Sequence, residues 1–123
     1  MCSRIAITSE SESSFTRLDL SILTASQISS AIDVIYKSNP TINLAILHCV
    51  SGYPAPPGDY NLKTISAMCD RFGLVVGISD HTLDNTTSIA SVVLGGSIIE
   101  KHFTLDRTNG GPDDSFSLEP AEM

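Results

Sequence analysis

The chain has 123 residues, of which 41% are hydrophobic and 17% charged, and its formal net charge is −7. This hydrophobic content suffices for one modest core and argues against a disordered chain, so we expect one globular unit. Only seven residues are Lys or Arg, and because they form no basic patch the acidic field would repel a phosphate backbone. The composition therefore argues against a nucleic-acid partner.

Cysteines and apolar runs bear on the compartment of the protein. Cys2, Cys49 and Cys69 are odd in number and lack metal-site spacing, so we interpret them as reduced thiols. No apolar run approaches the ~20 residues that are needed to cross a bilayer. The first residues lack the basic and apolar stretches of a secretory signal. Together these features predict a cytoplasmic protein with no membrane partner.

The N-terminal third shows the weakest pattern. Residues 1–17 are rich in Ser and Glu and are expected to form a disordered or irregular arm. Residues 18–23 predict a weak strand. Apolar residues at helical spacing then predict a helix over 26–38, with Ser26 as its N-cap.

From residue 18 to residue 123, short β-rich runs alternate with segments of helical periodicity, weakly over 18–38 and strongly from residue 43. The expected strands are 43–50, 74–81 and 97–104, and the expected helices are 62–72 and 84–94. This alternation indicates parallel βα units, hence an α/β fold that is either an open doubly wound sheet or an eight-stranded barrel. In both folds, functional residues gather at the carboxyl ends of the strands.

Polar side chains crowd those carboxyl ends. Because side chains alternate along a strand, Ser79 shares a face with His81, and Glu100 shares a face with His102. Adjacent strands lie ~4.8 Å apart, so two inward histidines at equivalent heights could reach one ion. Imidazole nitrogens suit Mn, Fe, Co or Zn. The two strand ends therefore predict a site for a divalent metal ion.

Each of these residues also has a plainer structural interpretation. The two histidines could be hydrogen-bonded core residues. Glu100 could support the metal site or act as a general base, or it could form a buried salt bridge with a lysine. Tyr53, in a Pro-rich loop, could cover the core or contact a substrate. His48 is interpreted as structural, and Asp113-Asp114 as part of a solvated loop.

Four strings, in this order and at this spacing, carry a family resemblance: LHCVSGYPAPPGDYNL, GISDHTLDN, LGGSIIEKHFTLDR and GGPDDSFSLEP. Over residues 43–122 the chain resembles the sialic acid synthase (nonulosonic acid synthase) family, whereas residues 1–23 do not share the resemblance. The family fold is a (β/α)₈ barrel followed by a small antifreeze-like domain. Its members condense phosphoenolpyruvate with an N-acetylated amino sugar, which yields phosphate and a nine-carbon keto sugar acid.

The resemblance also implies roles for individual residues. His81 and His102 would be the ligands of a divalent ion, usually Mn²⁺, and Glu100 would be the catalytic base. The substrate contacts implied in the same way are Ser51 and Ser79 for phosphoenolpyruvate, and Tyr53 and Asp113 for the acceptor sugar.

The resemblance covers only part of such a barrel, from about the fifth strand to the eighth, without the antifreeze-like domain. We therefore expect the chain to be inactive alone or to need a complementary half-barrel, whereas full-length members of the family would be homodimers. Two alternatives stay open, a metal-dependent aldolase that uses pyruvate and a non-enzymatic half-barrel remnant. The ending GGPDDSFSLEP leans toward the members that make pseudaminic acid.

Overall fold

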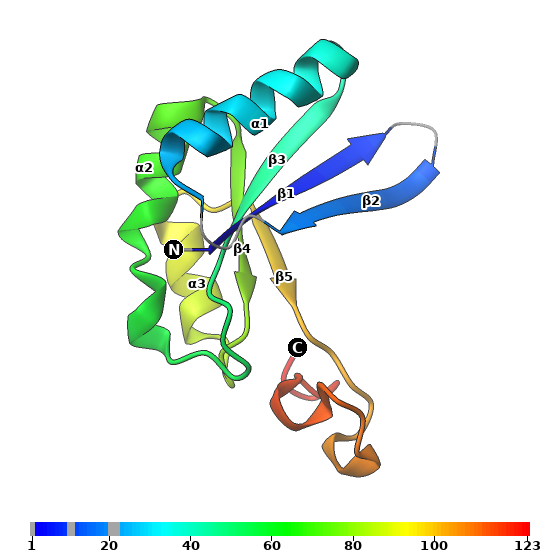
Figure 1. Ribbon diagram of the computed structural model, residues 1–123. Coiled ribbons are helices and arrows are strands. Elements are labelled where there is room, and N and C mark those ends of the chain that lie inside the picture. Colours follow the sequence, from blue (N-terminus) through cyan, green and yellow to red (C-terminus); the bar gives the residue numbers. More distant parts are fainter. Residues whose placement is uncertain (1, 10–11, 20–22) are drawn as a thin grey trace.

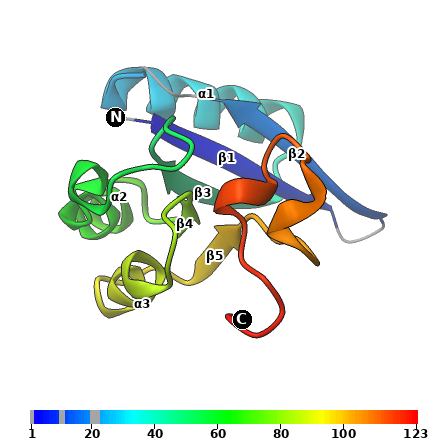
Figure 2. The same cartoon turned by 90° about the horizontal axis from the view of Figure 1, so that it is seen from below.

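The computed structural model describes residues 2–9, 12–19 and 23–123. A five-stranded sheet in the order β2-β1-β3-β4-β5 forms its centre, and three helices arch over one side of that sheet (Figures 1 and 2). The strands are β1 (Cys2–Ser9), β2 (Glu12–Asp19), β3 (Asn43–Cys49), β4 (Val75–Asp80) and β5 (Ile98–Lys101). The helices are α1 (Ala25–Ser38), α2 (Lys63–Phe72) and α3 (Thr86–Val93), and the short 3₁₀ turns are Pro57–Tyr60, Arg107–Asn109 and Asp114–Phe116.

The three strands β3, β4 and β5 are parallel and are joined by helices, which confirms the predicted α/β class. The strand β3 is buried from Leu44 to Cys49, as its nearly continuous apolar sequence predicts for a strand covered on both faces. The strand β5 ends at Lys101, three residues before the end of the strand expected over 97–104. His102 therefore lies directly after its strand, as His81 does after β4.

The N-terminal residues differ from the irregular arm expected over 1–17. The strand β1 pairs antiparallel with β3, from Cys2 opposite Cys49 to Thr8 opposite Asn43, and β2 pairs antiparallel with β1. Backbone pairing satisfies the N–H and C=O groups along the edge of β3 whatever the polarity of the added side chains, so a Ser/Glu-rich composition does not exclude it. The weak strand expected over 18–23 coincides with β2 only at residues 18–19, and residues 20–22 lie outside the described residues.

The start of α1 also differs from its prediction. Thr24, rather than Ser26, is the N-cap, and its hydroxyl accepts a hydrogen bond from the Gln27 N–H while the Gln27 side chain accepts one from the Thr24 N–H. This reciprocal pair is a capping box, which needs a hydroxyl residue and a Glu or Gln three positions later. Thr24 and Gln27 meet that spacing, whereas Ser29, three residues after Ser26, does not supply the second partner.

The core lies between the sheet and the helices α1 and α2. Its centre is formed by side chains with no exposed surface, which come from β3, β4, α2 and the 3₁₀ turn before α2: Ile46, Ile78, Ile65 and Tyr60. Among the described residues, no helix combines the length and the apolar character needed to cross a membrane.

Gly77 on β4 lies opposite Ile98 on β5, where there is no room for a side chain. A Cβ atom built at this position would lie 2.3 Å from the Ile98 carbonyl oxygen and 2.7 Å from a Leu47 methyl carbon. Because a backbone atom cannot yield as a flexible side chain does, Gly77→Ala is expected to lower the free energy of unfolding by about 1–3 kcal/mol. Urea denaturation would measure this, with Gly58→Ala as control, since nothing lies within 4 Å of a Cβ built at Gly58.

Candidate active site

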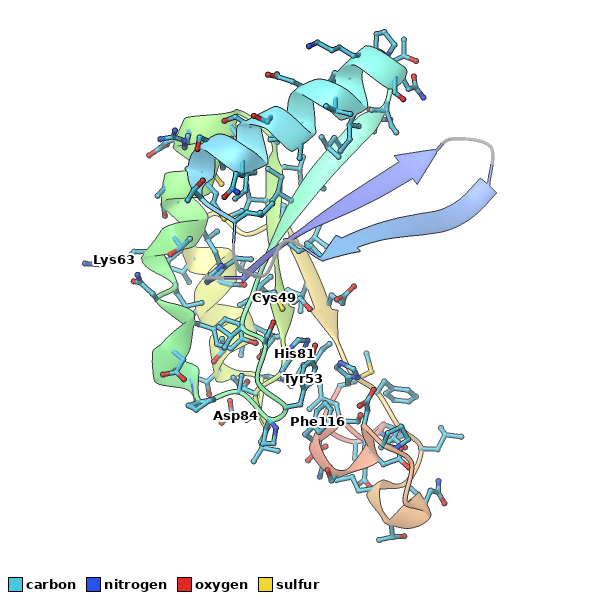
Figure 3. All side chains as sticks on the ribbon, viewed as in Figure 1. Cys49, Tyr53, Lys63, His81, Asp84 and Phe116 are labelled. Atoms are coloured by element: carbon cyan, nitrogen blue, oxygen red, sulfur yellow. The ribbon has the colours of Figure 1, made fainter. Side chains whose placement is uncertain are left out.

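Two imidazole rings meet at the carboxyl ends of β4 and β5. Asp80 and Lys101 are register partners at the ends of these parallel strands, so the residues that follow them, His81 and His102, lie at the same height. Their ring centroids are 5.2 Å apart, with an angle of 64° between the ring planes. Figure 3 shows His81 at this end of the sheet, close to Tyr53. The structure thus brings together the two histidines that the sequence predicts as metal ligands.

The orientation of the His81 ring is set by the contact of its Nδ1 with the Val50 carbonyl, while its Nε2 lies beside Ser79. Its Nδ1 lies 3.0 Å from the Val50 carbonyl oxygen, and its Nε2 lies 3.2 Å from the Ser79 hydroxyl oxygen. A carbonyl oxygen can only accept, so Nδ1 must carry the proton of this contact. The neutral ring then has its lone pair on Nε2, which is the form in which imidazole binds a metal ion.

The backbone around His81 is held by a buried phenol. The Tyr60 hydroxyl accepts a hydrogen bond from the His81 N–H at 2.7 Å and donates one to the Ser79 carbonyl oxygen at 3.0 Å. Tyr60 has no exposed surface, and this burial raises the pKa of its hydroxyl well above the ordinary tyrosine value. The group therefore stays protonated and keeps both its donor and its acceptor role.

Ser79 and Glu100 face each other below the histidines. They are register partners on β4 and β5, and the Ser79 hydroxyl donates its one proton to Glu100 Oε1 at 2.7 Å, so it does not also donate to His81 Nε2. Ser79 is fully buried, whereas Glu100 is partly buried. The lysine next to Glu100, Lys101, forms its ion pair with Asp80 on the other face of the sheet. The structure thus gives Glu100 a serine partner across the strands.

An aromatic cover lies over the two histidines. The Tyr53 ring stacks on His81, with centroids 4.3 Å apart and an interplanar angle of 29°, and remains 46% exposed. Phe116 lies on the C-terminal segment, the residues 102–123 that follow β5. Its ring centroid is 5.1 Å from that of His102 and 5.6 Å from that of Tyr53 (Figure 3). Tyr53 therefore borders the site, as one of its two sequence interpretations requires.

Phe116, like Tyr60, is a residue of this site that the sequence did not predict. It is buried and contacts both His102 and Tyr53. A single aromatic residue among Gly, Asp and Ser was the available signal, because a loop without a buried anchor has little reason to carry a phenylalanine.

The acidic pair Asp113-Asp114 divides between two roles. Asp113 Oδ2 lies 3.4 Å from His102 Nδ1, with the Asp113 side chain 55% exposed, and Asp114 accepts a hydrogen bond from the Gly111 N–H. A carboxylate beside Nδ1 favours the proton on that nitrogen and leaves the lone pair on Nε2. Asp113 therefore lies on the Nδ1 side of His102, as the Val50 carbonyl does for His81, but at a longer distance. Ser51 is exposed, one residue beyond Val50.

His48 lies apart from the pair, on β3. It is buried, and its Nε2 is in hydrogen-bond contact with the Tyr60 carbonyl oxygen. This contact fits the structural role inferred from its position in an apolar strand.

In His81 and His102, the Nδ1 atom faces a carbonyl or a carboxylate oxygen and leaves Nε2 for a ligand. Two such imidazole rings suit a divalent ion of the Mn, Fe, Co or Zn type. Among the described side chains, no group of three or more His, Cys, Asp or Glu residues is placed to hold a metal ion. The chain would therefore supply the two Nε2 atoms of His81 and His102, and water or substrate oxygens would have to supply the other ligands.

The C-terminal segment carries part of this site and is held by Glu122. Its carboxylate accepts a hydrogen bond from the Glu119 N–H at 2.9 Å and pairs with the Arg107 guanidinium, and these contacts lower its pKa. The stabilisation is therefore present above the ordinary glutamate pKa and is lost as pH falls through the lower folded-state value.

We expect the Glu119 amide to become exposed to hydrogen exchange in that acidic window, as measured by NMR. Glu122→Gln is the control, because it cannot titrate and should remove most of this pH response. An unchanged response in Glu122→Gln would assign the transition to another acid of the segment. Asp106 is such an acid, since hydrogen bonds from Thr108 lower its pKa too.

Several known proteins are similar to this chain in sequence or in structure. The chain is 46% identical over 98 residues to the N,N'-diacetyllegionaminic acid synthase of Campylobacter jejuni, covering 79% of this chain and 29% of that protein. It is 35% identical over 102 residues to the pseudaminic acid synthase of Helicobacter pylori, covering 83% of this chain and 30% of that protein. The N-acetylneuraminic acid (sialic acid) synthetase of Leptospira borgpetersenii, solved in complex with citrate, superposes with a TM-score of 0.73 at 38% identity, covering 81% of this chain and 34% of that one.

The chain thus spans about a third or less of the length of these proteins. The model of the NeuB family matches residues 18–123, which extends the expected resemblance toward the N-terminus and leaves the strand β1 and most of β2 outside the match. The chain belongs to the NeuB family, whose members named above make sialic, pseudaminic and legionaminic acids.

Proposed function

We propose that the chain is a segment of a synthase that condenses phosphoenolpyruvate with an N-acetylated amino sugar to give a nine-carbon keto sugar acid. The observation that carries this proposal is the histidine pair, with its centroids 5.2 Å apart at the carboxyl ends of neighbouring parallel strands. In α/β barrels, this is the face on which substrates bind and react.

In this proposal His81 and His102 hold a divalent ion, Mn²⁺ by family resemblance, through their Nε2 atoms. Such an ion supplies Lewis acidity, which makes an aldehyde carbon more electrophilic without a proton. Glu100 is the proposed general base, and the Ser79 hydroxyl at 2.7 Å holds its carboxylate in place.

The remaining side chains are proposed to contact the two substrates. Ser79 and Ser51 are assigned to phosphoenolpyruvate, and Tyr53 and Asp113 to the acceptor sugar. The exposed Tyr53 ring supports the second assignment, since an aromatic face at the rim of a site suits the apolar face of a sugar. The higher identity to the legionaminic acid synthase favours an acceptor of that type over the pseudaminic type toward which the C-terminal string leans.

We further propose that the 123 residues are inactive alone. Phosphoenolpyruvate is highly negative and needs cations, and Lys101, which precedes His102 in the chain, is paired with Asp80 on the other face of the sheet. Arg107 is paired with Glu122. A complementary half-barrel, or the longer chain as a homodimer, would have to bring the missing cations.

The test is an assay of phosphate release and keto sugar acid formation from phosphoenolpyruvate and several N-acetylated amino sugars. It compares the chain alone with the chain mixed with the first two-thirds of the Campylobacter relative. Activity only in the mixture is expected. Product formation from pyruvate, without phosphate release, would instead identify an aldolase. Product from the chain alone would contradict the proposed inactivity, and no product under any condition would favour a non-enzymatic remnant.

A further inference from the structure

A buried ion pair lies on the face of the sheet opposite to the histidines. Asp80 and Lys101, which directly precede His81 and His102, pair with an Nζ to Oδ2 distance of 3.1 Å. The Asp80 side chain is fully buried and the Lys101 side chain is 9% exposed. Because side chains alternate along a strand, these two point toward α3 while the histidine rings point toward the substrate side.

The carboxylate of Asp80 has a partner on each side. Its Oδ1 accepts hydrogen bonds from the Thr82 N–H and hydroxyl, both at 2.8 Å, and its Oδ2 accepts one from the Ser88 hydroxyl at 2.5 Å. The Lys101 ammonium donates to the Thr82 carbonyl oxygen at 2.7 Å. Asp80, Thr82, Ser88 and Lys101 thus form one connected network, which joins the ends of β4 and β5 to the first turns of α3.

This network holds the residues on both sides of His81. Asp80 and Thr82 are fixed by the contacts above, so the backbone of His81 between them has little freedom to shift. Lys101, which donates to Thr82, directly precedes His102. If the ends of β4 and β5 moved apart, the Asp80–Lys101 ion pair would therefore have to lengthen.

A buried ion pair is a poor source of stability, because removing both charges from water offsets much of their attraction. Apolar side chains of similar size would fill the same space at lower cost, but they would not define a distance between the two strands. The geometry therefore indicates that the ion pair fixes the distance between the ends of β4 and β5.

We propose that the Asp80–Lys101 pair is a positioning pair that sets the distance and orientation of the His81 and His102 rings. The inference builds on the proposed function, in which these rings share one ion. Neither Asp80 nor Lys101 touches that ion or a substrate.

The main variant for the test is the double substitution Asp80→Asn/Lys101→Met, which removes both charges and keeps the approximate volume. Two quantities are measured on the whole chain: NOEs between the two imidazole rings in the metal-free protein, and Mn²⁺ affinity by calorimetry. We expect the inter-ring NOEs to weaken strongly and the Mn²⁺ affinity to fall by about tenfold, at the lower end of what outer partners of metal ligands contribute. Lys101→Arg alone, which retains the charge beside Asp80, should leave both quantities near their wild-type values.

Ile65→Val is the matched control, because it reduces packing in the core under α2 and touches neither strand end. It should lower stability with no effect on NOEs or affinity. If the double variant does not fold, Ser88→Ala removes one contact of Asp80 and should give a smaller change of the same kind. Unchanged NOEs and affinity in a folded double variant would overturn the inference. If the double substitution weakens the inter-ring NOEs but the wild-type chain binds no Mn²⁺, the positioning pair would be supported and the metal site itself refuted.

Discussion

Replacing either His81 or His102 by alanine is expected to lower the affinity of the chain for Mn²⁺ by about 100-fold or more. Each substitution removes one of the two nitrogen ligands that the chain offers, and the described residues supply no third His, Cys, Asp or Glu close enough to compensate. Isothermal titration calorimetry with MnCl₂ would measure the loss, and circular dichroism would show that the sheet and helices persist.

The third histidine of the chain provides the control for this experiment. His48 is buried on β3, against the Tyr60 carbonyl oxygen and away from the pair. His48→Gln is therefore expected to reduce stability and to leave the Mn²⁺ affinity of the folded chain unchanged. Unchanged binding in both His81→Ala and His102→Ala would show that the pair does not hold the ion, even if the wild-type chain binds one elsewhere.

The positions of these two histidines could be predicted because they depend on rules that act over a few residues. A nearly continuous apolar strand followed by a helix suffices to predict the carboxyl end of β4. For β5, which ends three residues earlier than expected, the period of two predicts only which side chains share a face. The same rules predict that Ser79 and Glu100 lie on the face of the histidines and that Lys101 lies on the other. The contacts of Lys101 with Asp80 and of Ser79 with Glu100 agree with this division.

The C-terminal segment of the site could not be derived in this way. Asp113 and Phe116 come from a loop without periodicity, and their places beside His102 depend on how that loop folds back over the strand ends. In the structure this return is fixed by contacts such as those of Arg107 with Ser117 and Glu122, which join residues 10 and 15 positions apart. Local patterns carry no information on such pairs.

The N-terminal hairpin illustrates a second limit. Its pairing with β3 is made by backbone groups, which are the same for every residue type except proline, so a polar composition misleads. The family match begins only at residue 18, and β1 occupies the edge of β3 in antiparallel orientation, whereas the neighbours of a βα unit within a barrel are parallel. A complementary half-barrel would therefore have to displace β1 in order to continue the sheet at this edge.

Replacing Tyr60 by phenylalanine is expected to lower the free energy of unfolding by about 2–4 kcal/mol. The ring would still fill its place in the core, but the His81 N–H and the Ser79 carbonyl oxygen would each lose a buried partner, at roughly 1–3 kcal/mol for each group. Urea denaturation measures the loss. Tyr36→Phe is the matched control, because Tyr36 lies at the margin of the core on α1 and its ring is only partly buried.

The same substitution separates stability from site geometry. The Tyr60 hydroxyl joins the backbone on both sides of Asp80, so its loss frees the turn that carries His81 while leaving both imidazole rings in the chain. We therefore expect Tyr60→Phe to weaken Mn²⁺ binding as well, by less than the loss of a ligand, whereas Tyr36→Phe should change neither quantity. A stability of Tyr60→Phe equal to that of the wild type would mean that water replaces the hydroxyl, and that the buried phenol does not hold the strand end.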